Sequence, residues 1–227
     1  MKYFLVLFFF VFSCAKIDNE NQFSLSLEIE GLKKGIIYLE KITDSSMVAI
    51  DSVLYNYNGN NSIQFQGKID EPEIMIISLT FENEPDPQRF PFFVEKSNII
   101  LKTRLKDFGF KVNSKGSEND SIYRQYLDIN KKFNNEKLDL ISKSLAFQKS
   151  VNKDSISFYD SKLVSVNKRQ FLHNANFAMR YSNYEIAPYI AITDLRESST
   201  ILDTIYKSLS NGIKNSKYAL QLKTLID

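Results

Sequence analysis

Hydrophobic and polar positions alternate with a period of two over much of the first half of the chain. The clearest run has its apolar positions at Phe23, Leu25, Leu27 and Ile29, each separated by a polar residue. Such alternation is typical of a half-buried strand. Comparable runs predict further strands at residues 36–40, 48–55, 62–68, 73–80, 90–94, 98–101 and 108–112.

Turn signals separate these runs. Asn58 and Gly59 form a strong hairpin signal, because both residues tolerate a positive φ. The run at residues 73–80 is rich in Ile and Met, so we expect a strand that is buried on both sides. Short strands joined by tight turns predict an antiparallel β-sandwich or a partly open barrel over residues 23–115.

After Gly116 the apolar period becomes helical. The first set of apolar positions is Ile122, Tyr126, Ile129, Phe133, Leu140 and Leu145. We expect a helix of about 25 residues, capped by Asn119 or Asp120. A second long helix should run from Asp154 to about Tyr181. Its predicted buried side consists of Ile156, Leu163, Val164, Phe171, Ala175 and Ala178.

The two long helices are joined by a short polar link, which favours an antiparallel pair. A shorter helix is expected with Pro188 in its first turn, and another at residues 217–225. The overall expectation is therefore an α+β protein, in which the β domain at residues 23–115 precedes an α-helical domain at residues 116–227.

The N-terminus has the form of an export signal. Lys2 precedes an apolar run at residues 4–12, and Ser13 and Cys14 follow it. The apolar run is much shorter than the roughly 20 residues of a membrane-spanning helix. Val11, Phe12 and Ser13 before the cysteine resemble a lipoprotein signal, so residues 1–13 are predicted to be removed and Cys14 to be acylated. The alternative is an ordinary secretory signal with a chance cysteine.

This interpretation makes residues 14–22 a polar tether and places the protein in the cell envelope. Palmitate and other acyl chains on Cys14 would hold it in a membrane. Ala15 follows the cysteine in place of Asp, so we expect the outer membrane, on its periplasmic face or at the cell surface.

Charge and cysteine content narrow the classes of function. The chain has 29 basic and 27 acidic residues, which gives a formal charge of +2. A nucleic-acid-binding protein usually carries a basic block or face, so no nucleic-acid partner is expected. Cys14 is the only cysteine, and its acylation would leave no thiol for disulfides, catalysis or metal binding.

Four short motifs carry a family resemblance. They are Phe65-Gln66-Gly67 with Pro72, the segment 95–101, Gly116-Ser117-Glu118-Asn119 and the segment 183–189. Together they resemble the uncharacterised N-terminal β domain and helical segment of Bacteroidota lipoproteins, in which a thioredoxin-like domain of the AhpC/TSA type follows. The resemblance extends over residues 23–226.

The resemblance implies a role near thiol–disulfide exchange, but it assigns that chemistry to no residue here. Thiol exchange needs a thiolate and usually a resolving partner. No Cys-x-x-Cys pair is present before the sequence ends at Asp227. An alternative function is therefore that of an accessory protein acting with a separate thioredoxin-like partner, and another is that the chain is a truncated relative of such a reductase.

Candidate catalytic residues are few. His173 is the single histidine, and we interpret it as a packing or surface residue. Acidic residues cluster at 70–73 and 82–86, beside Pro72 and Pro85, and we interpret both clusters as solvated loops. Paired buried carboxylates would instead favour a hydrolase, and oxygen ligands in the second cluster would suit calcium.

The segment 88–93 combines Arg89 with three phenylalanines and is the best candidate contact surface. The alternative, which we favour, is that its phenylalanines belong to the core of an edge strand marked by Pro91. We therefore predict no catalytic, cofactor-binding or metal-binding residue, and no enzyme. We therefore expect a lipid-anchored module that binds or scaffolds a protein partner. The sequence does not identify the partner or the oligomeric state.

Overall fold

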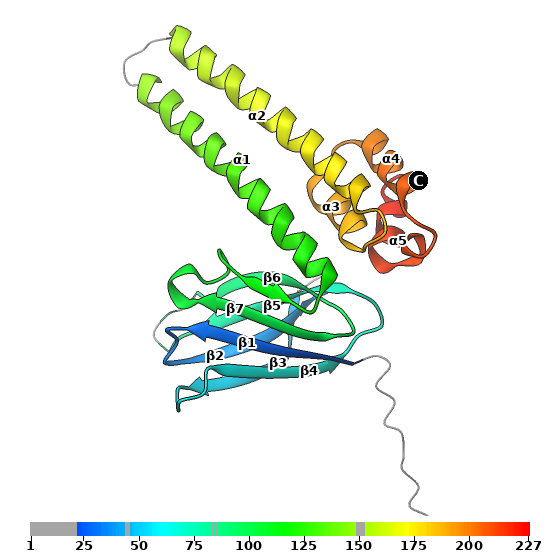
Figure 1. The fold of residues 1–227 in the computed structure, drawn as a ribbon. Coiled ribbons are helices and arrows are strands. Elements are labelled where there is room, and N and C mark those ends of the chain that lie inside the picture. The colour runs from blue at the N-terminus through cyan, green and yellow to red at the C-terminus, as the bar shows by residue number, and fades with distance from the viewer. Residues whose placement is uncertain (1–21, 44–45, 83, 85, 149–152) are drawn as a thin grey trace, which may run out of the picture.

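The computed structural model describes residues 22–43, 46–82, 84, 86–148 and 153–227. Within these ranges the strands come first and the helices follow (Figure 1). Cys14, the predicted signal at residues 1–13 and nearly all of the tether lie outside the described residues. Across the described ranges, none of the helices combines the length and the apolar character needed to cross a membrane.

The strands form two four-stranded sheets that pack face to face. Sheet A consists, in order, of β4 (Ser62–Lys68), β1 (Gln22–Glu30), β7 (Asn98–Arg104) and β8 (Asn113–Lys115). Sheet B consists, in order, of β3 (Met47–Asn56), β2 (Lys34–Ile42), β5 (Glu73–Thr80) and β6 (Gln88–Val94). Apolar side chains from both sheets share one core. The sandwich prediction is confirmed, and the sheets do not close into a barrel.

Two features of the strand pairing differ from the predicted hairpins. The Asn58–Gly59 turn joins β3 to β4, which belong to different sheets, so it is a link between layers and the hairpin prediction is wrong. Gly59 does adopt the positive φ that the turn signal indicated. In addition, β1 and β7 are parallel, with Leu27 opposite Leu101. Because these strands are far apart in the sequence, no local pattern predicts their pairing.

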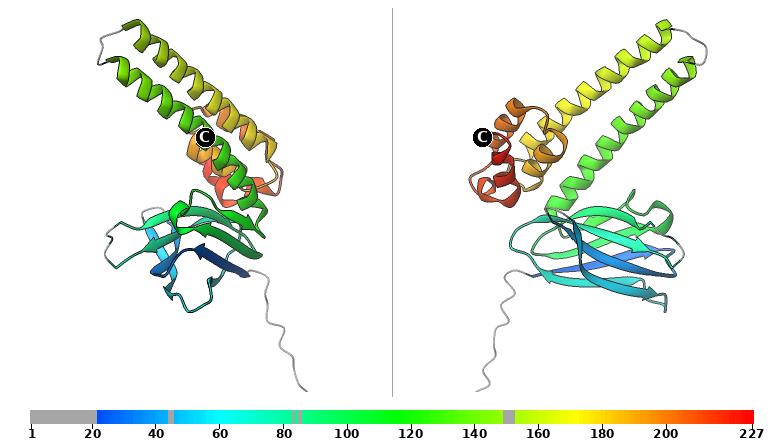
Figure 2. Two further views of the ribbon diagram at one scale, coloured as in Figure 1. Left: turned by 60° about the vertical axis from the view of Figure 1, so that its left-hand side comes forward. Right: turned by 180° about the vertical axis from the view of Figure 1, so that it is seen from behind.

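The helical part begins with two long antiparallel helices, as predicted (Figure 2). The helices are α1 (Glu118–Gln148), α2 (Lys153–Arg180), α3 (Ile186–Asp194), α4 (Ser199–Ser208) and α5 (Lys217–Thr224). Helices α3 to α5 gather beside the C-terminal end of α2, whereas the far ends of α1 and α2 extend away from the sandwich. The predicted buried side of α2 is wrong at Val164, which is 69% exposed, while Val166 is buried in its place.

A second apolar core joins the helices to sheet B. Ile74 of β5 and Phe93 of β6 point away from the sandwich core and pack among side chains of α1, α2, α3 and α5. On the opposite side of β5, Met75 and Ile77 lie in the sandwich core. The prediction that this strand is buried on both sides is thereby confirmed. The Tyr218 hydroxyl also accepts a hydrogen bond from the Ile74 N–H, at 2.8 Å.

The passage from the sandwich into α1 depends on Gly116 and Ser117. Gly116 has a φ of 89°, and a Cβ at this position would lie 1.9 Å from the Asn98 carbonyl oxygen, so only glycine fits. The Ser117 hydroxyl accepts a hydrogen bond from the Asp120 N–H at 3.0 Å and caps the helix. The predicted caps, Asn119 and Asp120, are wrong because their side chains bond to other parts of the molecule.

Candidate functional site

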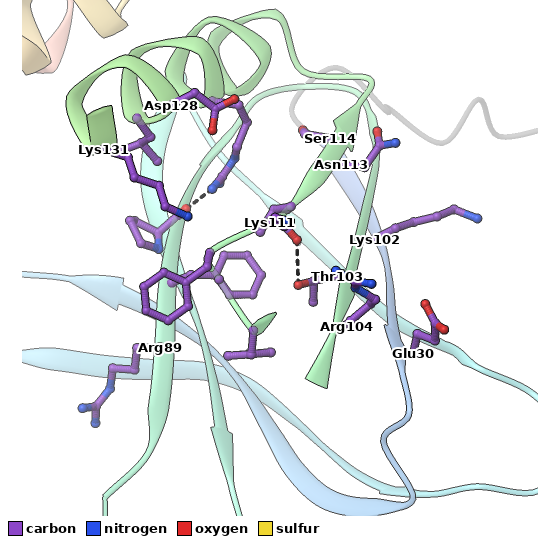
Figure 3. A pocket seen from close by; sticks show the side chains of 18 of the residues that line it. Glu30, Arg89, Lys102, Thr103, Arg104, Lys111, Asn113, Ser114, Asp128 and Lys131 are labelled. Atoms are coloured by element: carbon purple, nitrogen blue, oxygen red, sulfur yellow. Dashed lines mark hydrogen bonds between the residues drawn. The ribbon is translucent and has the colours of Figure 1, made fainter. Parts of the chain in front are cut away.

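A large concave surface lies where the two sheets fail to close. Its walls are β6 on one side and β1, β7 and β8 on the other, and residues 121–135 of α1 lie over it (Figure 3). Residues 108–112 form part of its floor. We call this surface the groove. Its volume is about 1220 Å³, which exceeds the roughly 300–1,000 Å³ of typical small-molecule pockets.

The segment between β7 and β8 fills the gap between the sheets. Its Phe108 is 5% exposed and packs edge-on against Phe90, with ring centroids 5.0 Å apart. Gly109 has a φ of 76°, and a Cβ there would lie 2.7 Å from the Phe90 side chain. The strand predicted at residues 108–112 is therefore wrong: residues 108–110 form a turn, and β8 begins only at Asn113.

The turn at Gly109 sends the two flanking phenylalanines in opposite directions. Phe108 enters the sandwich core, whereas Phe110 is 75% exposed and lines the groove. Lys131 of α1 lies over the Phe110 ring, with its Nζ 5.6 Å from the ring centroid. This distance suits a cation–π contact. The groove therefore combines a large exposed aromatic surface with a cation above it.

Cationic side chains outnumber acidic side chains in the lining of the groove. It is lined by the cationic side chains of Arg89, Lys102, Arg104, Lys111, Arg124 and Lys131. Three acidic residues also line it, Glu28, Glu30 and Asp128, so the formal excess is three positive charges. Figure 3 shows Lys131 and Asp128 projecting from α1, and Lys102 and Arg104 on the opposite wall.

Most of these cations have carboxylate partners. Lys102 pairs with Glu28 at 2.8 Å, and Arg89 lies 3.6 Å from Glu40. Arg104 pairs with Asp107, and Arg124 pairs with Asp120. Among the residues that the structure describes, Lys111 and Lys131 form no ion pair. These two lysines are therefore the cations of the groove whose charge is open to a ligand.

The back of the groove is a rigid contact between α1 and the edge of sheet B. Asp120 accepts a hydrogen bond from the Phe93 N–H at 2.9 Å. Arg124 pairs with Asp120 at 3.0 Å and donates to the Pro91 carbonyl. An edge strand exposes backbone groups that must find partners. The Asp120–Arg124 pair supplies those partners to β6 and fixes the position of α1 over the groove.

A second polar cluster lies beside this pair, between the sandwich and α3. Glu95 accepts hydrogen bonds from the Glu118 N–H at 2.6 Å and from the Asn119 Nδ2 at 3.0 Å. Asn119 Nδ2 also donates to Glu185 at 3.0 Å, while its Oδ1 accepts from the Ile186 N–H at 3.1 Å. We call the Asp120–Arg124 pair and this cluster together the junction. Burial raises the pKa of Glu185 above its ordinary value, and the nearby Glu95 carboxylate adds to the rise.

Three of the four motifs that carried the family resemblance meet at the junction. Glu95 belongs to the segment 95–101, Asn119 to the segment 116–119 and Glu185 to the segment 183–189. These residues hold the β-sandwich and the helices together, and they do not line the groove. The motifs thus describe how the two parts of the molecule are joined.

The first acidic cluster is solvated only at Asp70, which is exposed, and the solvated-loop prediction is wrong for Glu71 and Glu73. Glu73 is 5% exposed, and its two carboxylate oxygens pair with Lys41 at 2.6 Å and Lys217 at 2.8 Å. Glu71 accepts a hydrogen bond from the Lys217 N–H at 2.8 Å, at the start of α5. Both carboxylates therefore attach α5 to the sandwich. The second cluster is exposed, and Glu82 pairs with Lys34 at the surface.

His173 packs between two aromatic rings of the long helices. Its ring centroid lies 5.8 Å from that of Phe133 and 6.0 Å from that of Phe177. Burial lowers the pKa of His173, and the Arg180 charge adds to this effect. Among the residues whose placement is described, His, Cys, Asp and Glu side chains form no group of three or more that could hold a metal ion.

The segment 88–93 has the edge-strand role that the sequence favoured. Phe90 and Phe92 lie in the sandwich core and Phe93 in the helical core, so none of the three is a free contact surface. Sequence reasoning missed Phe110, Lys111 and Lys131, which are exposed in the groove. The available signal was Gly109 between two phenylalanines, because a glycine inside an apparent strand often marks a break.

Comparison with known proteins gives a family for the N-terminal part alone. Residues 23–123 match the model of a family described as a domain of unknown function, DUF4369. A comparison with curated proteins finds no match. The matched region extends from the start of β1 into the first turns of α1, and so includes Asp120 of the junction. The N-terminal part of the chain is therefore similar to an uncharacterised domain.

Proposed function

We propose that this protein is a lipid-anchored binding module of the cell envelope, which holds a partner in the groove. The observation that carries this proposal is Phe110, a large aromatic side chain that is 75% exposed on the floor of a concave surface. Exposed aromatic groups beside cations are typical of binding surfaces. The proposed activity is non-enzymatic, because the groups that line the groove are suited to holding a partner.

The anchor is supported by the sequence of residues 1–14. Mass spectrometry of the protein isolated from membranes tests it directly. We expect the mature chain to begin at Cys14 and to carry the mass of added acyl chains. A free thiol at Cys14, or an intact segment 1–13, would contradict the anchor and would leave the groove proposal untouched.

Photo-crosslinking tests the groove. A benzophenone amino acid is placed at Phe110 in the full chain, and the cells that produce it are irradiated. Leu54 provides a matched control, because it is 70% exposed on β3, at the opposite edge of sheet B from the groove. We expect a discrete adduct from position 110 that is absent from position 54. Equal labelling at both positions, or no adduct at position 110, would refute the proposed function.

A further inference from the structure

We propose that the groove binds an extended, acidic segment of another polypeptide and places one of its apolar side chains against Phe110. This inference rests on the proposed function and specifies the class of ligand. Three independent properties of the groove support it: its charge, the free strand along its wall and its exposed aromatic floor.

The unpaired cations of the groove favour an acidic ligand. Lys111 and Lys131 lie on the floor and the roof of the groove, and neither forms an ion pair with any described residue. The formal excess of three positive charges in the lining is offset by Glu40, Asp107 and Asp120, which pair with the three arginines. The attraction for an acidic ligand therefore rests on these two lysines. Asp128 and Glu30 lie among the cations, so a ligand of uniformly high negative charge would meet repulsion at these points. Carboxylates spaced along a chain fit this pattern better than a dense polyanion.

The edge strand β8 in the wall of the groove favours a ligand with an extended backbone. β8 is the last strand of sheet A, and it pairs with β7 through only one of its sides. Within the described ranges, no strand pairs with its other side. An edge strand offers backbone N–H and C=O groups to an added strand, which is a common mode of peptide recognition.

The exposed aromatic ring on the floor of the groove favours contact with an apolar side chain of the ligand. Phe110 lies in the groove together with the partly buried Leu127 of α1. An apolar or aromatic side chain that covers Phe110 would remove its exposed ring from water. Each square ångström of apolar surface so buried contributes about 25 cal/mol. At about 1220 Å³ the groove also has room for several residues of an extended chain.

A synthetic peptide tests this inference on the full chain. The probe is a fluorescein-labelled peptide of about ten residues, in which Glu alternates with Val and Tyr, as the alternation of an added strand requires. Its binding is measured by fluorescence anisotropy, next to the same peptide with Lys in place of Glu. We expect the acidic peptide to bind and the basic peptide not to bind. Binding of the basic peptide with similar affinity would overturn the charge argument.

Paired variants separate the contributions. Lys111→Gln with Lys131→Gln should weaken binding of the acidic peptide about tenfold. Lys168→Gln with Lys223→Gln removes two exposed lysines elsewhere, on α2 and α5, and should change binding less than about twofold. Phe110→Ala should weaken binding about fivefold. If the control pair weakens binding as much as the groove pair, the attraction is a property of the whole surface and the inference fails.

Two further outcomes are decisive. N-methylation of alternate backbone amides of the peptide should abolish binding, and unchanged binding would overturn the pairing with β8. Heparin is tested in the same assay. If it binds more tightly than the acidic peptide, and if this binding depends on Lys111 and Lys131, the ligand is an anionic polysaccharide and the polypeptide proposal fails. If neither probe binds while the adduct from position 110 still forms, the ligand class is wrong and the proposed function stands.

Discussion

The junction and the groove are two contacts between the same helix and the same β-sandwich, yet they are built differently. At the junction, Asp120 and Asn119 satisfy backbone and side-chain groups of the sandwich within hydrogen-bonding distance. In the groove, about three turns further along α1, Lys131 lies over the exposed ring of Phe110, with its Nζ 5.6 Å from the ring centroid. The first contact is complete without a ligand, whereas the second leaves apolar surface and charge exposed.

This difference shows which residues maintain the fold and which are free for binding. Protein interiors are close-packed, so an opening beside a well-packed contact is a specific feature of the molecule. Asp120 and Arg124 hold α1 at a set distance from sheet B, and this distance creates the groove. Changes at the junction should therefore reduce stability, and changes on the groove floor should not.

The largest effect is expected for Gly116→Ala at the start of the junction. The added Cβ would lie 1.9 Å from the Asn98 carbonyl oxygen at a φ of 89°, so we expect a loss of about 4 kcal/mol or more. Gly59→Ala is the matched control, because Gly59 has a φ of 98° with no atom within 4 Å of the new Cβ. It should cost about 1 kcal/mol. Urea unfolding followed by circular dichroism measures both variants, and equal losses would refute the steric argument.

Phe108 and Phe110 provide the sharpest test of the comparison, because they are chemically identical neighbours. Phe108→Ala should lower the free energy of unfolding by about 3–5 kcal/mol, since it empties part of the sandwich core. Phe110→Ala should change it by less than about 0.5 kcal/mol. Thermal and urea unfolding of the two variants measure the difference. A large loss for Phe110→Ala would mean that the groove floor serves the fold.

Asp120→Asn tests the contact that holds α1 to the edge of sheet B. The substitution leaves the Arg124 charge without a partner at a nearly buried site, so we expect a loss of about 3 kcal/mol. Asp203→Asn is the matched control, since Asp203 pairs with Lys207 at the same helical spacing on an exposed face. It should cost about 0.3 kcal/mol. Similar losses in the two variants, measured by chemical unfolding, would contradict a special role of the junction pair.

The smallest expected effect concerns the pH dependence of the junction. Because burial raises the pKa of Glu185 in the folded protein, the folded state binds a proton more tightly than the unfolded state. This group therefore adds stability as the pH falls through its raised pKa, and the gain is complete below its ordinary value of 4.5. Relative to Glu185→Gln, the wild type should gain stability as the pH falls through the raised pKa, and the gain should level off below about pH 4.5. Unfolding midpoints that keep a constant difference would refute this.

The sequence alone predicts most of the elements in which the apolar pattern extends over many residues. The runs at residues 62–68 and 73–80 are strands with the predicted bounds, because alternating burial in a two-layer sandwich imposes a period of two. The period changed to helical after Gly116, and both long helices follow it. These signals are local, so they are readable without knowledge of the tertiary partners.

The errors come from tertiary contacts that the local pattern does not encode. Residues 108–112 alternate as a strand does, because the turn at Gly109 also sends neighbouring side chains in opposite directions. Glu73 follows a proline and lies near other acidic residues, which is a pattern typical of a solvated loop. In the fold it is paired with Lys41 and Lys217, which are far from it in the sequence. The groove itself is assembled from residues between 28 and 135, and no short window contains it.

The cover that α1 gives to β6 has a consequence for cleavage of the chain. A fragment cut after Lys115 would lose both Asp120 and Arg124, which now occupy the Phe93 N–H and the Pro91 carbonyl. The edge of β6 would then have free backbone groups, and a strand from another copy of the chain would be able to pair with it. The first turns of α1 thus protect the edge of sheet B from pairing with a second copy of the chain.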